Sequence, residues 1–94
     1  MSVSLINIGY GNMVVTERII AVIQYDSAPA KRITKAAETS GLLINSTQGR
    51  KSRSVIIMDD RHVILSAVQT ETLANRLNNR DLLKSNDQEL DNEN

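Results

Sequence analysis

Three cations stand close together in residues 49–53, between two apolar runs of the chain. Arg50, Lys51 and Arg53 have the charge to neutralise phosphates, and Gly49 allows the backbone to come close to a partner. A short connection between two strands holds such side chains near one tip. We call residues 49–53 the basic loop and predict that it is the phosphate-binding surface; ordinary solvated surface charge is the competing interpretation.

Two other groups of cations are weaker candidates for DNA binding or for a subunit interface. Lys31 and Arg32 fall in the first turn of a predicted helix, where positive charge opposes the helix dipole unless an anion lies nearby. Ordinary surface charge explains them slightly better. Arg18 follows Glu17, and we expect a local ion pair or a subunit contact at Arg18 in preference to a DNA contact.

The remaining polar residues give no sign of catalysis. His62 is the single histidine and the chain has no cysteine, so neither a metal site nor a nucleophile with a base can be assembled from the sequence. Residues 9–11, Gly-Tyr-Gly, are too few for a dinucleotide-binding motif and predict a turn instead. We therefore expect no enzyme activity, no cofactor and no metal.

Charge is distributed unevenly along the chain. Residues 1–84 hold all 11 Lys and Arg but 7 of the 11 Asp and Glu, which gives this part a net charge of +4. The other four acids lie in residues 85–94. A basic body with an acidic tail is a weak hint of a nucleic-acid partner. We predict one domain over residues 1–84 and a disordered acidic tail over 85–94, which would be able to screen the basic loop.

Hydrophobic patterning predicts a small α+β domain. Apolar runs bounded by turn residues predict strands at residues 3–8, 19–24, 42–47, 54–58 and 62–68, the last two joined as a hairpin across 59–61. The turn residues at 9–12 are expected to lead residues 13–15 away from the first strand. Asp26 or Ser27 caps a first helix that ends at Gly41. Thr70 caps a second helix, whose apolar stripe comprises Leu73, Ala74 and Leu77. We expect a mostly antiparallel sheet, one helix inserted between its strands, and a C-terminal helix.

Two central strands carry apolar residues at successive positions, in residues 55–58 and 63–65. A sheet with one solvated face needs apolar residues only at alternate positions. Each face must therefore be covered, either by a helix or by a neighbouring subunit. The second option favours a homo-oligomer.

Five blocks of the chain resemble the RemA family of bacterial regulators of extracellular-matrix genes. They are LINIGYGNMV at 5–14, DSAPAKR at 26–32, GRKSR at 49–53, VIIMD at 55–59 and HVILSAV at 62–68. The resemblance runs in register over about four-fifths of the chain, and several blocks are long enough to be specific.

The resemblance implies a transcriptional regulator of matrix or biofilm genes that binds double-stranded DNA, with a fold related to the LytTR-type β domain. It also implies a homo-oligomeric ring of about eight subunits with DNA at its rim. The DNA-binding residues of the family fall on Arg50 and Lys51, with Arg53 close by. Lys51 stands where the family pattern has a second arginine, so a planar base contact is less expected there than phosphate attraction.

The expected location is the cytoplasm, in association with the nucleoid, because no apolar run is long enough to span a membrane and no signal sequence opens the chain. Two other functions stay open at this point. The basic loop would also suit an RNA-binding module, with Tyr10 and Tyr25 available for base stacking. A structural ring that binds an acidic protein would use the same charge.

Overall fold

The computed structural model of the chain describes residues 3–85, with side chains described as far as residue 79. The predicted acidic tail, apart from Ser85, lies outside the described residues. In chain order the elements are β1 (Leu5–Gly9), β2 (Asn12–Val15), the 3₁₀ helix η1 (Thr16–Arg18), β3 (Ile19–Gln24), α1 (Ala28–Ser40), β4 (Leu43–Asn45), β5 (Ser54–Met58), β6 (Val63–Ser66) and α2 (Thr70–Ser85).

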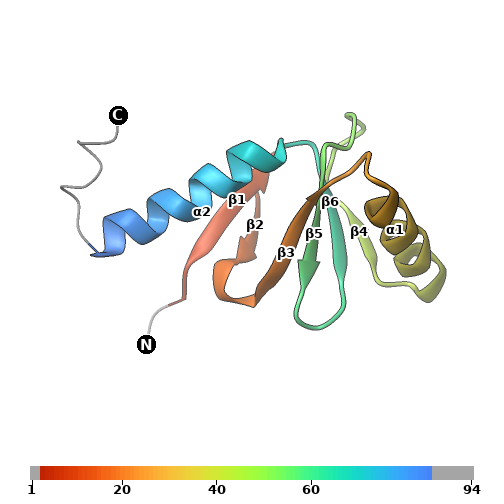
Figure 1. The fold of residues 1–94 in the computed structure, drawn as a ribbon, viewed down its shortest axis with the longest axis horizontal. Coiled ribbons are helices and arrows are strands. Elements are labelled where there is room, and N and C mark those ends of the chain that lie inside the picture. The colour runs from red at the N-terminus through yellow and green to blue at the C-terminus, as the bar shows by residue number, and fades with distance from the viewer. Residues whose placement is uncertain (1–2, 86–94) are drawn as a thin grey trace.

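The predicted α+β class is confirmed, with α1 inserted between strands and α2 at the C-terminal side (Figure 1). The strands form two sheets instead of one. An antiparallel hairpin of β1 and β2 makes the first sheet, and the second has the strand order β3-β5-β6-β4. Residues 13–15 therefore pair back along the first strand, and the expectation that they lead away from it is wrong. In the second sheet β4 runs parallel to β6, while β5 pairs antiparallel with both β3 and β6.

Local signals explain where α1 begins and ends. The Ser27 hydroxyl accepts a hydrogen bond from the Ala30 amide at 3.2 Å, and Pro29 lies in the first turn, where a missing N–H costs nothing. Gly41 ends the helix with φ +77°, a left-handed conformation that suits glycine. The predicted bounds of this helix are confirmed, and Ser27 is the cap.

Both faces of the four-stranded sheet are covered by the chain itself. Val55, Val63 and Leu65 pack against α1 on one face. Ile56 and Ile64 project to the other face, where they meet the β1–β2 hairpin and Leu73 of α2. Of the two alternatives drawn from the pattern, coverage by the chain itself is the one observed, so the apolar residues at successive positions in β5 and β6 do not require a neighbouring subunit.

The second helix differs from its prediction at both ends. The Leu73 amide donates to the Gln69 carbonyl at 3.0 Å, so Gln69 occupies the cap position and Thr70 is the first helical residue. The expectation that Thr70 caps this helix is wrong by one position. The helix continues to Ser85 although the apolar pattern loosens after Leu77. Across residues 3–85 no helix is both long and apolar enough to cross a membrane.

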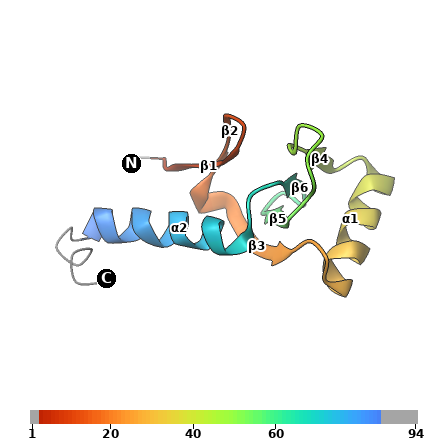
Figure 2. The same cartoon turned by 90° about the horizontal axis from the view of Figure 1, so that it is seen from above.

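The two helices lie at opposite ends of the molecule, as both views show (Figures 1 and 2). The sheet lies between them and fixes the positions of the turns at its two ends. The basic loop is one of the connections at one of these ends.

Candidate nucleic-acid interface

Three connections converge at one end of the four-stranded sheet. The register pairs Gln24 with Ser54 and Ser54 with Ser66, so the ends of β3 and β6 lie beside the beginning of β5. The basic loop leads into β5 from this end, and the β3–α1 and β6–α2 connections leave from it (Figure 1). Segments that are far apart in sequence thus surround the basic loop.

The backbone of the basic loop is held by hydrogen bonds. The Arg50 amide donates to the Thr47 carbonyl at 2.9 Å, which closes a turn in which Gln48 and Gly49 have φ of +55° and +80°. The Arg53 amide donates to the Ser66 carbonyl at 2.8 Å, and the Arg53 carbonyl accepts from the Tyr25 amide at 3.1 Å. The side chains of Arg50, Lys51 and Arg53 are exposed above this fixed backbone.

Buried hydroxyl groups tie the elements beneath the basic loop together. The Ser66 hydroxyl donates to the Ile8 carbonyl at 2.8 Å, joining β6 to the β1–β2 hairpin. The Ser54 hydroxyl donates to the Val68 carbonyl at 2.8 Å. Ser54 and Ser66 are fully buried, so each satisfied hydroxyl fixes the position of a neighbouring turn. Sequence reasoning did not single out these serines.

Two hollows flank the basic loop, and Lys51 and Arg53 line both. The first has a volume of about 280 Å³ and is bordered by Tyr10 and Arg50. Tyr10 is 52% exposed and has φ +55°, an uncommon backbone conformation for a residue other than glycine. The predicted turn at residues 9–11 is thus present and displays an aromatic ring next to the cations.

The second hollow lies between the basic loop and the β3–α1 connection and has a volume of about 230 Å³. Lys31 lines it, with its ammonium nitrogen 5.6 Å from the centroid of the Tyr25 ring. Of the two cations that were expected in the first turn of α1, the fold therefore brings Lys31 to the basic loop, and Arg32 is the fifth residue of the helix. Arg32 is exposed on α1 and lines neither hollow.

Arg18 lies at the opposite end of the sheet, because Asp59 follows the last residue of β5 whereas the basic loop precedes the first. The Arg18 guanidinium donates from Nε to both Asp59 carboxylate oxygens, at 3.0 and 3.2 Å, and its Nη2 lies 2.9 Å from Oδ1. The bond to Asp59 raises the pKa of Arg18 above its usual value. An ion pair was one of the two contacts expected for Arg18, and the structure forms it with Asp59. A subunit contact at Arg18 stays a prediction.

His62 makes a local contact with Asp60. Its Nδ1 lies 2.9 Å from the Asp60 carboxylate, and this hydrogen bond lowers the pKa of Asp60 below its usual value. The contact closes the β5–β6 turn, as expected for a residue at the end of a hairpin. Among the side chains described, those of residues 3–79, no group of three or more His, Cys, Asp or Glu is placed to hold a metal ion.

Comparison with known protein families gives a match over most of the chain. The family model described as "RemA-like: Extracellular matrix regulatory protein A-like" matches residues 5–77. This chain belongs to the RemA-like family. The match covers the basic loop, both flanking hollows and the apolar stripe of α2.

Several relatives are similar to this chain over most of their length, and each is named as a putative regulatory protein. One from Geobacillus sp. (strain WCH70) is 60% identical over 77 residues, which are 82% of this chain and 88% of the relative. One from Thermoanaerobacter sp. (strain X514) is 53% identical over 85 residues, 89% and 88% of the two chains. One from Moorella thermoacetica is 50% identical over 91 residues, 97% and 100%. The family and the names of these relatives indicate a regulatory role.

Proposed function

We propose that this RemA-like protein is a transcription regulator that binds double-stranded DNA through phosphate contacts made by the basic loop. The observation that carries the proposal is the exposure of Arg50, Lys51 and Arg53 on a backbone fixed from below by hydrogen bonds to Thr47, Ser66 and Tyr25. Cations on a rigid loop lose little freedom on binding, so their attraction to phosphates is retained as affinity.

The geometry favours phosphate contact over base reading. The three cations project from a loop at the end of a sheet, and neither α1 nor α2 presents them as a recognition helix does. Contacts of this type fix the position of DNA and carry little sequence information. Preference for a target would then come from DNA bendability and from the spacing of repeated loops.

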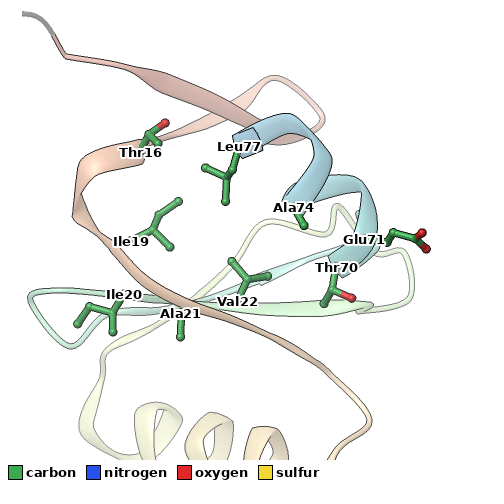
Figure 3. Close-up of a pocket in the computed structure, with 9 residues that line it drawn as sticks. All are labelled: Thr16, Ile19, Ile20, Ala21, Val22, Thr70, Glu71, Ala74 and Leu77. Carbon is green, nitrogen blue, oxygen red and sulfur yellow. The ribbon is translucent and has the colours of Figure 1, made fainter. Parts of the chain in front are cut away.

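Repetition of the loop in a homo-oligomeric ring would supply the affinity that one loop lacks. After the first subunit binds DNA, the next contacts become intramolecular, so weak single sites add up to strong binding. An apolar surface suited to assembly lies between β3 and α2 (Figure 3). There Ile19 and Val22 point toward Leu77 of α2, across a groove of about 480 Å³.

The edge strand β3 adds an exposed apolar side chain to this surface. The register of β3 with β5 skips Ile20, which forms a bulge and is 65% exposed. A bulge blunts the edge against the addition of another strand, so side-chain packing is the expected mode of assembly there. Apolar residues this exposed at a groove are typical of protein interfaces.

The genes under control are proposed from the family description alone, which refers to the regulation of extracellular matrix. We propose that the target genes are those of matrix or biofilm formation and that the protein acts at the nucleoid in the cytoplasm.

The test is DNA binding by the purified full chain and by Arg50→Ala at two salt concentrations. Wild type should retain a long duplex and lose affinity steeply as salt rises, because binding releases counterions. Arg50→Ala should lose retention without a change in oligomer mass. Arg61→Ala is the matched control, since Arg61 is an exposed arginine in the β5–β6 turn at the other end of the sheet. Absent or salt-independent binding by wild type would refute the proposal.

RNA binding is the second candidate, favoured by the position of the two tyrosines. Tyr10 and Tyr25 each border a hollow that Lys51 and Arg53 also line, and aromatic rings beside cations are typical of single-strand binding. Competition between duplex DNA and single-stranded RNA of equal length separates the two functions. We expect the duplex to win; displacement by RNA at lower concentration would replace DNA with RNA as the partner.

A further inference from the structure

The hollow on the Tyr25 side of the basic loop has the composition of an anion site. Lys31, Lys51 and Arg53 line it from α1 and from the basic loop, and Asp26 is the acid at its border. Three cations against one carboxylate leave a charge of +2 around a space of about 230 Å³. The amide side chain of Gln69, from the β6–α2 connection, is a further polar group in the lining.

Lys31 lies where the helix dipole and the neighbouring cations outweigh the single carboxylate of Asp26. It lies in the first turn of α1, where the helix dipole repels a cation. Its ammonium group is nevertheless held over the Tyr25 ring, at 5.6 Å from the centroid, and so stays beside Lys51 and Arg53. A bound anion would remove the repulsion among these cations and from the dipole together.

The size of the hollow limits what it can hold. Pockets for whole small-molecule ligands usually have volumes of about 300–1,000 Å³. At about 230 Å³, this hollow suits a phosphate group with part of a sugar and is small for a complete nucleotide. Lys51 and Arg53 also line the hollow next to Arg50, so the two spaces form neighbouring positions along one basic surface.

We propose that this hollow seats a phosphate group, and that in the DNA complex the group is a backbone phosphate next to the one held at Arg50. Lys31 is then a DNA-binding residue that the fold adds to the basic loop, and each subunit contacts two phosphates of the duplex. This inference rests on the proposed function, but it makes a claim about Lys31 and Tyr25 that DNA binding by the loop alone does not require.

The decisive measurement is the salt dependence of duplex binding by Lys31→Ala and by Lys35→Ala. Lys35 is exposed one turn further along α1 and does not line the hollow, so the two variants lose the same charge. A phosphate contact contributes about 0.9 to the slope of log affinity against log salt. We expect Lys31→Ala to lose about that amount for each subunit in contact with DNA, whereas Lys35→Ala keeps the wild-type slope. Equal slopes in Lys31→Ala and wild type would overturn the inference, even where Arg50→Ala abolishes binding and so supports the proposed function.

Titration with inorganic phosphate decides the matter independently of DNA. In NMR spectra of the wild-type assembly, the Gln69 side-chain amide should shift saturably, and the shift should vanish in Lys31→Ala but persist in Lys35→Ala. If wild type binds no duplex, the proposed function fails, and this titration still decides whether the hollow is a phosphate site. The lack of a saturable shift in wild type would then overturn the inference as well.

Discussion

Lys51 stands where the family resemblance led us to expect a second arginine. An ammonium group attracts phosphate as a point charge, whereas a guanidinium group donates two parallel hydrogen bonds from a planar fork. Lys51 is exposed and lines both hollows, so an arginine at this position has space on either side.

We expect Lys51→Arg to tighten duplex binding by less than about tenfold, the range that one added charge-assisted hydrogen bond permits. Because the net charge is unchanged, the salt slope should stay at the wild-type value. Fluorescence anisotropy with a labelled duplex at several salt concentrations measures both quantities. A weaker complex, or a changed slope, would show that Lys51 acts by something other than phosphate attraction.

The part of the candidate site that is contiguous in sequence could be predicted from the sequence. The residues that only the fold brings to it could not. Arg50, Lys51 and Arg53 lie within four positions, so one short loop predicted their grouping. Tyr25 and Gln69 reach the same place only because β3 and β6 end beside the start of β5. The sequence did contain one signal that the tyrosines belong to the site. The chain has two tyrosines and no Phe or Trp, and both tyrosines fall in predicted turns or at strand ends.

At the scale of elements, the β1–β2 hairpin depends on the conformation of its turn. Gly9 has φ +113°, and a Cβ atom added there would lie 3.1 Å from Cγ2 of Val68. Gly11 has φ +78°, with nothing within 4 Å of an added Cβ. Substitution of either glycine would therefore strain the backbone, but only at Gly9 would the added side chain also clash with a neighbour.

We expect Gly11→Ala to lower the free energy of unfolding by about 1 kcal/mol, and Gly9→Ala to lower it by about 3 kcal/mol. The larger loss arises because Val68 packs against the core formed by the hairpin and α2 and cannot move freely. Urea denaturation followed by circular dichroism measures the difference. Equal losses in the two variants would mean that Val68 yields at little cost.

Elements whose bounds are set by neighbouring residues were predicted accurately, and pairings between distant residues were not. Ser27, Pro29 and Gly41 define α1 from neighbouring residues alone, and its bounds were predicted correctly. The pairing of β4 with β6 joins residues about twenty positions apart and is parallel, which no turn residue announces. The antiparallel pairing of β3 with β5 joins residues 30 to 39 positions apart, and the convergence of turns around the basic loop depends on it, so that convergence could not be derived from local signals either.

At the scale of the whole molecule, a closed ring needs two different surfaces on each subunit, because its contacts run head to tail. The groove between β3 and α2, with Ile20 at its border, is one candidate surface. The β1–β2 hairpin offers a second, since Leu5 and Met13 are 48% and 53% exposed and line another hollow together with Arg76 of α2.

We expect Ile20→Asp and Met13→Asp each to reduce the assembly to monomers, since a buried, unpaired carboxylate is costly at an apolar contact. Each variant keeps one intact surface, so an equal mixture of the two should form dimers, which light scattering detects by mass. Ile44→Asp is the matched control, because Ile44 is an exposed isoleucine on the other edge strand, β4. Dimers formed by either variant alone would indicate a two-fold contact between identical surfaces, and a ring built head to tail through these two faces would then be excluded.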